Sequence, residues 1–314
     1  DSAGGGWFFH TRKPTETKPL VGGMEYSGVV LQVGPNVTAL KVGDRVCGVQ
    51  DVATQKNPGT WAEQTMAPEK DIVRIPADSD ISFVQAASVG MAAFVAGDMY
   101  KRATFPPSRG SRVLVVGASG GLGTFLLCLL DKHRGTQAMD IVAVCSGKNA
   151  ESVRRLGAKD VVDYNQGPFG EQLAGKDKFD VVFDFVGGTD VERNAKMVMK
   201  KGGKFITAVG PMQGVGDRML TCWEWHSWAC GLMGRLMASG CCCCCTSYQY
   251  QMAGGMPPLK AGDFHHAVIE SGARAEVSME VPFTGDDAAI REALRRVASR
   301  HTGGKVVINM EAAS

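Results

Sequence analysis

The chain has 314 residues, of which 44% are hydrophobic and 21% charged, and its formal net charge is +2. This length suits two domains with a shared core, and the small net charge argues against nucleic acid as a partner. No signal peptide is expected, and the longest charge-free stretch, residues 236–259, is too polar to span a membrane.

Ten cysteines are present, five of them isolated and five in the run Cys241 to Cys245. A secreted disulfide scaffold is usually shorter and spaces its cysteines apart. We therefore expect a reducing, intracellular compartment. Five adjacent cysteines cannot all point at one ion, so we expect no metal there.

The first third of the chain carries short β patterns. We predict strands over residues 28–33 and 45–49, with further β structure over 61–75. A helical pattern rich in alanine and methionine follows over 80–102. This part is predicted to be an antiparallel β unit that leads into a helix.

From residue 111 strands alternate with helices, and the strands are apolar on both faces. That pattern predicts a parallel sheet covered on both sides, and hence an α/β, doubly wound fold. The expected strands are 112–116, 141–145, 160–162, 181–185 and 204–209, and the expected helices are 122–132, 150–156 and 190–199. Beyond these we expect strands at 247–253, 275–281 and 305–309, and helices at 264–271 and 286–300.

The most informative segment is the glycine-rich turn at 117–123, between a predicted strand and a predicted helix. Gly120 and Gly121 would let the backbone approach a pyrophosphate, and Gly123 would let the helix pack closely. The helix N-terminus would supply unpaired N–H groups. We predict a dinucleotide site, although glycines alone also serve ordinary turns.

The end of the second predicted strand indicates which dinucleotide is bound. It reads Cys145-Ser146-Gly147-Lys148-Asn149, with no carboxylate to hold a ribose 2′-hydroxyl. A hydroxyl and a lysine suit a 2′-phosphate, which favours NADPH over NADH. The alternative is that Lys148 is a solvated surface charge.

Several ordered motifs resemble the zinc-free quinone oxidoreductase branch of the medium-chain dehydrogenases/reductases. They are Gly23 to Val30, Val42 to Val46, Leu156 to Tyr164 and Gly304 to Val307. Within this branch the chain is similar to the mitochondrial reticulon-interacting NADPH oxidoreductases. The zinc-dependent branch has a histidine where Met24 stands, together with a four-cysteine lobe, so the resemblance implies a protein without zinc.

The resemblance implies a GroES-like catalytic domain, residues 1–87 and 275–314, around an NADP-binding Rossmann domain, residues 88–274. The family's first strands are expected to precede Asp1, which would leave the GroES-like domain N-terminally incomplete. Ser119, Gly120, Gly121 and Leu122 would contact the pyrophosphate. Ser146, Lys148 and Tyr164 would surround the adenosine ribose and its 2′-phosphate. The residues beside the nicotinamide would be Val186, Gly187, Val209 and Gly210.

The implied activity is hydride transfer from NADPH to a quinone or an α,β-unsaturated carbonyl, and no catalytic residue is assigned. Tyr26, Trp61 and the Trp223 to Trp228 segment are candidates for the rim of the substrate site, with core or dimer packing as the alternative.

A second hypothesis is a catalytically weak or inactive accessory subunit of a larger complex, such as one at an organellar membrane. The partners considered are therefore a small quinone or enone, a second copy of the chain, the subunits of a larger assembly, and a peripheral membrane surface. An organelle, either a mitochondrion or a plastid, is favoured over the cytosol.

Overall fold

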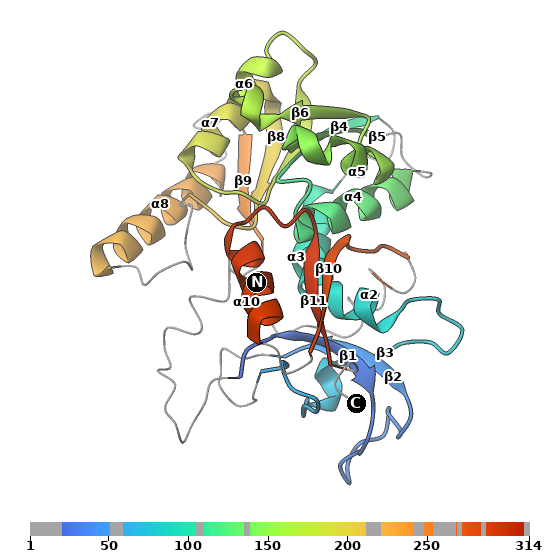
Figure 1. Cartoon of the computed structure of the whole chain (residues 1–314). Helices are drawn as coiled ribbons and strands as arrows, with labels where there is room; N and C mark the ends of the chain where they lie inside the picture. Colours follow the sequence, from blue (N-terminus) through green and yellow to red (C-terminus); the bar gives the residue numbers. More distant parts are fainter. Residues whose placement is uncertain are drawn as a thin grey trace.

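The computed structural model describes residues 21–50, 59–104, 110–134, 139–211, 221–240, 248–253, 268, 272–283 and 287–310. Figure 1 shows a larger lobe built on a parallel sheet, and a smaller lobe that contains β1, β2 and β3. The strands β10 and β11 lie between the sheet of β1 to β3 and the larger lobe.

The larger lobe contains six parallel strands in the order β6-β5-β4-β7-β8-β9. Their bounds are Ser111–Val116 (β4), Met139–Cys145 (β5), Asp160–Asp163 (β6), Phe179–Asp184 (β7), Met199–Thr207 (β8) and Tyr248–Met252 (β9). The chain starts in the middle, at β4, and winds outward in both directions. This order is the one found in Rossmann sheets, so the predicted doubly wound α/β fold is confirmed.

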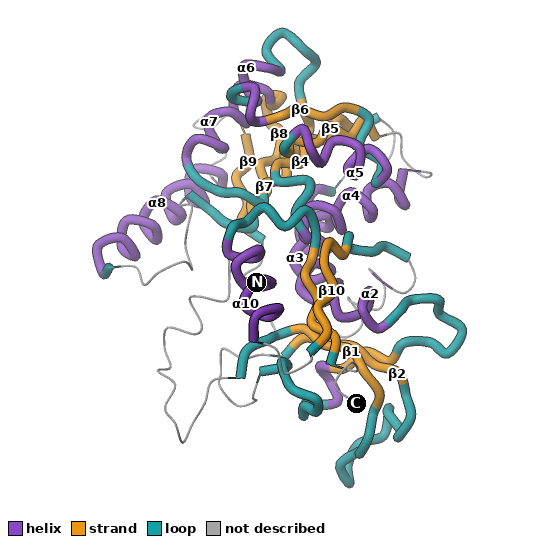
Figure 2. The backbone as a smooth tube through the Cα atoms, viewed as in Figure 1, coloured by secondary structure: helices purple, strands orange, loops and turns teal. Residues whose placement is uncertain are grey.

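Alternate residues of each central strand enter two different cores. Val113 and Val115 pack on one face, together with α3 (Gly90–Ala103) and α4 (Gly121–Arg134). Leu114 and Val116 pack on the other, together with α6 (Phe169–Gln172) and α7 (Thr189–Val198). Figure 2 shows helices on both sides of the strands. Because both faces are buried, the strands read as continuous apolar runs.

The remaining elements of the larger lobe are short, apart from one long helix. They are η2 (Gly147–Asn149), α5 (Ala150–Arg155), η3 (Tyr164–Gln166) and α8 (Cys222–Gly240). Helix α8 packs against the edge strand β9 and projects from the side of the lobe in Figure 1. Within the described residues, no helix is long and apolar enough to cross a membrane.

The smaller lobe takes strands from both parts of the chain. An antiparallel sheet contains β1 (Glu25–Val29), β2 (Arg45–Val49) and β3 (Ile72–Arg74), with η1 (Glu69–Asp71) before β3. A parallel pair contains β10 (Val277–Pro282) and β11 (Lys305–Asn309), which α10 (Asp287–Ala298) connects. Helix α2 (Phe83–Ser88) contacts both β1 and β11, and so joins the two groups.

The structure corrects three of the predicted elements. The segment 61–71 is not β structure, because the backbone of Trp61 pairs with Gly22 and Pro68 leads into a 3-10 turn. The predicted helix over 80–102 is two helices, with the break at Val89 and the first one held by a capping box at Ser82. Strand β8 starts five residues earlier than predicted, at Met199.

Two further differences concern the first strand and the segment after residue 210. The first strand lies at Glu25–Val29 rather than at 28–33. Where the sequence pattern was weak after residue 210, the structure has the helix α8. Nearly all of the predicted helix at 264–271, and the whole Cys241 to Cys245 run, lie outside the described residues.

Candidate cofactor site

The turn after β4 has the geometry that its glycines predict. Gly117 has a φ of +79°, and the N–H groups of Gly117 and Ala118 both donate to the Val144 carbonyl, at 3.1 and 3.2 Å. A Cβ on Gly123 would lie 2.4 Å from the Gly117 carbonyl oxygen and 2.7 Å from Ala118 Cα. Only glycine therefore lets α4 start this close to β4. The first N–H groups of α4 have no acceptor within the helix, so they can donate hydrogen bonds to an anion.

A lysine from the end of the chain covers this turn. A Cβ on Gly121 would lie 2.4 Å from Lys305 Cδ. Lys305 Nζ lies 2.5 Å from Glu25 Oε2, and Glu25 Oε1 accepts from the Met91 backbone N–H at 2.7 Å. Both charged side chains are largely buried, at 15% and 12% exposure. The pair thus links β1, α3 and β11 to the glycine turn after β4, and places a cation beside that turn.

Side-chain hydrogen bonds join the turn to the segments that follow β5 and β6. Asn149 Nδ2 donates to Ser119 Oγ at 3.0 Å. Asn165 Nδ2 donates to Ser146 Oγ at 3.2 Å. These contacts bring Ser119 and Ser146, which the sequence assigned to one cofactor, to one edge of the sheet.

A carboxylate that sequence reasoning did not consider lies beside Ser146. Asp163 ends β6, and a Cβ on Gly147 would be 2.5 Å from its Oδ2. The backbone N–H of Asn165, and to a lesser degree that of Gly147, holds the pKa of Asp163 below its usual value. Because these groups take up the carboxylate oxygens, the exposed side chains offered to a ligand here are Lys148 and Tyr164.

The turns after β7 and β8 are held by one buried pair. Asp184 is fully buried, and its Oδ1 accepts from the N–H groups of Val186 and Gly187, both at 2.9 Å. The Thr207 hydroxyl donates to Asp184 Oδ2 at 2.8 Å and accepts from the N–H groups of Val209 and Gly210. Burial raises the pKa of Asp184, and these hydrogen bonds oppose the shift.

The predicted nicotinamide residues lie together. A Cβ on Gly187 would be 2.5 Å from Val209 Cγ1, and the Gly188 N–H donates to the Gly210 carbonyl at 2.9 Å. Val186 is 40% exposed, and its Cγ2 lies 3.0 Å from the Cβ position of Gly117. The turns after β4, β7 and β8 therefore form one edge, at the carboxyl ends of the strands, where ligands bind in open α/β sheets.

The structure places the aromatic candidates for the rim of the substrate site in different environments. The Trp61 ring covers the Gly22–Gly23 backbone next to Met24 and is 44% exposed. Trp228 Nε1 lies 3.5 Å from the Cβ position of Gly210. The Tyr26 hydroxyl is buried near Gly48, and burial raises its pKa, so Tyr26 belongs to the interior of the small sheet instead of the rim.

The described cysteines that are buried carry inert thiols. Burial raises the pKa of Cys47 to about 12 and that of Cys145 to about 11. Among the residues that the structure describes, no group of three or more His, Cys, Asp or Glu side chains is placed to hold a metal ion.

Sequence reasoning missed Asp184, Thr207, Glu25 and the position of Lys305. A weak signal exists for the first two, because each is a polar residue at the carboxyl end of an otherwise apolar strand. Nothing local marks Lys305 as a neighbour of Gly121, because 184 residues of chain separate them.

The chain is similar to known oxidoreductases over nearly its whole length. The model for the alcohol dehydrogenase GroES-like domain matches residues 4–77, and that for zinc-binding dehydrogenases matches residues 156–238. The human NAD(P)H oxidoreductase RTN4IP1, a mitochondrial protein, is 30% identical over 317 residues, which cover 96% of this chain and 73% of that protein.

Two further relatives illustrate the range of this similarity. The chloroplastic NADPH-dependent alkenal/one oxidoreductase of Arabidopsis thaliana is 36% identical over 205 residues, 64% of this chain and 50% of that protein. A quinone oxidoreductase structure from Coxiella burnetii superimposes with a TM-score of 0.70 at 20% identity, over 97% of this chain and 82% of that one.

Proposed function

Because the chain belongs to the medium-chain dehydrogenase/reductase superfamily, we propose that it is an oxidoreductase that transfers hydride from NADPH to a quinone or an α,β-unsaturated carbonyl. The main support for this proposal is that the turns after β4, β7 and β8 lie together at one edge of the sheet. The reaction is proposed to need no zinc, since Met24 stands where the zinc-dependent branch has a histidine.

The residues present are proposed to hold two parts of a dinucleotide, the pyrophosphate and the nicotinamide. The backbone of residues 119–122, at the end of the glycine turn and the start of α4, would hold the pyrophosphate, with Lys305 as a neighbouring cation. The surface made by Val186, Gly187 and Val209 would accept the flat nicotinamide, because Gly187 adds no side chain. Asp184 does not touch the ligand in this account; it fixes the turns that do.

The choice of NADPH rests on Ser146 and Lys148. A hydroxyl and an ammonium can both bind a 2′-phosphate, by hydrogen bond and by charge. The nearby Asp163 is ionised at neutral pH, because backbone N–H groups hold its pKa below the usual value. Its charge would oppose a 2′-phosphate, and we propose that Ser146 and Lys148 outweigh it. The name of the Arabidopsis relative, an NADPH-dependent oxidoreductase, supports the same choice.

Bound NADPH supplies a hydride, which for an enone would go to the β-carbon while the α-carbon takes a proton from solvent. The chain's own task is to orient the two reactants and to exclude water from between them. Trp61, beside Gly22 and Gly23, and Trp228, beside Gly210, are our candidates for the wall of such a site. A solvent proton makes a dedicated acidic side chain unnecessary.

The compartment is proposed from the relatives alone. Their names place one in mitochondria and one in chloroplasts, so we propose an organelle for this chain as well.

The proposed function is tested by following deuterium from the cofactor to the product. NADPH deuterated at the transferred position is incubated with the protein and a small enone or a benzoquinone, and the products are analysed by mass spectrometry. We expect cofactor oxidation that depends on the acceptor, with deuterium at the β-carbon of the enone. Tight NADPH binding without oxidation would contradict the proposed enzymatic activity. It would favour an accessory subunit that retains the nucleotide-binding fold.

Cofactor choice is tested separately with Lys148→Ala, and with Lys132→Ala as a control on an exposed lysine of α4. We expect the first variant to weaken NADPH binding about tenfold while leaving NADH binding nearly unchanged, since one charged hydrogen bond contributes about 1.5 kcal/mol. Equal loss for both cofactors would contradict the assignment of Lys148 to the 2′-phosphate.

A further inference from the structure

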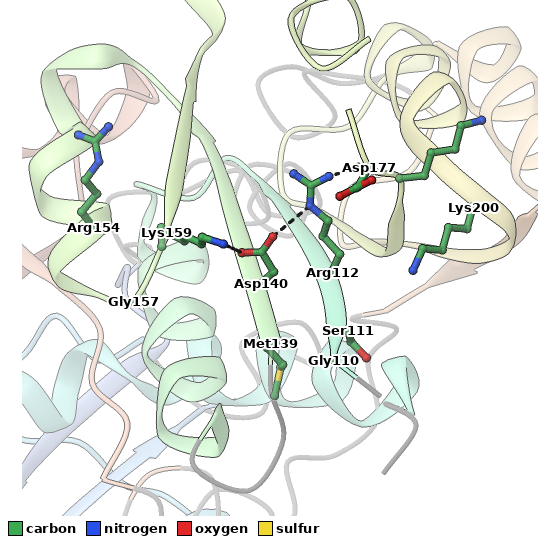
Figure 3. A pocket seen from close by; sticks show the side chains of 12 residues that line it. Gly110, Ser111, Arg112, Met139, Asp140, Arg154, Gly157, Lys159, Asp177 and Lys200 are labelled. Atoms are coloured by element: carbon green, nitrogen blue, oxygen red, sulfur yellow. Dashed lines mark hydrogen bonds and ion pairs between the residues drawn. The ribbon is translucent and has the colours of Figure 1, made fainter. Parts of the chain in front are cut away.

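The amino ends of the parallel strands border a groove of about 990 Å³. Arg112 Nε lies 3.2 Å from Asp140 Oδ2, and Lys159 Nζ lies 3.1 Å from Asp140 Oδ1. Figure 3 draws Arg154 on the opposite side of the groove from Ser111. The polar side chains therefore pair with one another or lie apart, and we assign no ligand to this groove.

Three side chains with chemical uses do converge on the outer face of α8. Trp223, His226 and Cys230 are spaced by three and four residues, so they follow one stripe of the helix. The opposite face of α8 is turned toward the larger lobe, because Leu232 packs against its core. The stripe is open to solvent, since Trp223 is 77% exposed and the other two side chains are exposed as well.

Measured contacts join these three side chains one after another. The Trp223 and His226 rings are stacked, with their centroids 6.3 Å apart and their planes at 29°. His226 Nε2 lies 3.5 Å from Cys230 Sγ, within reach of a hydrogen bond that involves sulfur. When the proton of the neutral imidazole is on Nδ1, Nε2 accepts that hydrogen bond from the thiol. The stripe thus places a base beside a nucleophile, and a flat aromatic ring beside the base.

The other cysteines whose side chains are described are poorly placed for reaction. Burial raises the pKa of Cys47 to about 12 and that of Cys145 to about 11, whereas the thiolate is the reactive form. Cys128 is half-buried, and its sulfur accepts from the Arg274 backbone N–H at 3.4 Å. Among the cysteine side chains that the structure describes, Cys230 is the exposed one.

We propose that Cys230 is a site of covalent modification by quinones and α,β-unsaturated carbonyls, with His226 as the base and Trp223 as a stacking surface. Such compounds are Michael acceptors, and a thiol beside a base is the nucleophile that adds to them. The exposed Trp223 ring favours a flat conjugated electrophile, because aromatic rings attract one another when stacked. The site uses neither NADPH nor the carboxyl edge of the sheet, so this inference does not rest on the proposed function.

The addition is balanced without an oxidant or a reductant. His226 accepts the thiol proton while the Cys230 sulfur forms a bond to the β-carbon of the acceptor. The π pair of the carbon–carbon double bond moves to the carbonyl oxygen as an enolate, and the imidazolium returns the proton to that enolate. With benzoquinone, a ring proton then moves to the other oxygen, and the product is a hydroquinone bound to the sulfur as a thioether.

The test incubates the reduced whole chain with an equimolar amount of benzoquinone, without NADPH, and maps the adducts by mass spectrometry. Cleavage after Arg218 and Arg235 gives one peptide that contains Cys222 and Cys230, and its fragment ions separate the two. We expect Cys230 to carry the first adduct. A first adduct on Cys222 or in the Cys241 to Cys245 run would overturn the proposal.

Removal of the base tests the role of His226. We expect His226→Asn to slow adduct formation at Cys230 about tenfold, less than for an enclosed base because water can also take the proton. The matched control is His301→Asn, which changes an exposed histidine beyond the end of α10 and should leave the rate unchanged. Equal rates for the two variants would overturn the proposal.

Trp223→Leu separates stacking from a merely structural role of the ring. Iodoacetamide alkylates a thiol but has no conjugated ring that could stack on Trp223. We expect the variant to slow benzoquinone addition about fivefold, in line with the loss of one aromatic contact, and to leave iodoacetamide alkylation unchanged. Equal slowing with both reagents would overturn the stacking role, because Trp223 would then act only through the helix.

Discussion

The two ends of the parallel sheet are built in different ways. At the carboxyl ends, glycine turns present backbone, and buried side chains such as Asp184 and Thr207 hold the turns in place. At the amino ends, charged side chains from several strands face one another across a groove. The first arrangement fixes the shape of a site before a ligand arrives, whereas the second supplies charge with little backbone constraint.

The difference affects how each end should respond to mutation. A backbone site fails when a side chain is added, because atoms overlap and the turn itself must move. A side-chain site loses affinity in steps, one charged group at a time, while the fold survives.

The largest effect is expected at Gly123. Alanine there would place Cβ 2.4 Å from a backbone oxygen of the turn. We expect Gly123→Ala to destabilise the chain by about 3 kcal/mol and to weaken NADPH binding about 100-fold. Urea unfolding and fluorescence titration measure the two quantities.

The control for that variant is Gly234→Ala in α8. This helical glycine has no atom within 4 Å of its Cβ position, so alanine should stabilise α8 by about 1 kcal/mol and leave NADPH affinity unchanged. Similar behaviour of the two variants would show that the phosphate turn does not require close packing.

A smaller effect is expected at Asp184. Asp184→Ala leaves the N–H groups of Val186 and Gly187 and the hydroxyl of Thr207 without their acceptor. We expect a loss of about 2 to 3 kcal/mol in unfolding free energy and weaker cofactor binding. Asp184→Asn keeps one oxygen for the two N–H groups, so its loss should be about half as large. Equal losses would mean that the turns do not depend on these hydrogen bonds.

The smallest effect concerns the pH dependence of contacts made by α7, the helix that follows the turn after β7. Glu192 of α7 receives hydrogen bonds from Arg235 of α8, at 2.6 Å, and from Tyr248 of β9, at 2.5 Å. Burial alone would raise the pKa of Glu192, but the hydrogen bonds from Tyr248, Arg235 and Lys196 outweigh it and hold the pKa below its usual value. These contacts keep α8, and with it Trp228, on the edge of the sheet.

The sign of the pH effect follows from that direction. An acid whose pKa is lowered on folding stabilises the fold above its unfolded pKa, about 4.3 for Glu, and this contribution is lost as the pH falls through the folded pKa. Glu192→Gln should therefore cost about 1 kcal/mol at pH 7 and less at pH 4. Asp190→Asn, an exposed acid on the same helix, is the control. A cost for Glu192→Gln that grows toward acid pH would contradict this reading.

The two ends also differ in what could be predicted from the sequence. The turn at 117–123 was predicted because strand, glycines and helix are contiguous, and the fold class followed from the alternation of apolar strands with helices. The groove was not predicted, because Ser111, Arg154 and Lys178 share no motif or spacing. The contact of Lys305 with Gly121 is equally non-local.

The small lobe shows the same limit on prediction. Residues 61–71 have a β-like composition, yet the backbone of Trp61 pairs with Gly22, and only Ile72–Arg74 joins the sheet. Tyr26 was a rim candidate, since alternation in a strand does not tell which face is buried. In both cases the tertiary partner decided the outcome.

The central claim is that the carboxyl edge of the sheet is the cofactor site. Hydrogen–deuterium exchange of the whole chain, with and without NADPH, tests it most directly. We predict slower exchange over residues 117–123, 146–148, 185–188 and 208–210, with no change over 110–112 and 176–180 at the opposite edge. Protection confined to the amino edge, or no protection at any of these turns, would contradict the account.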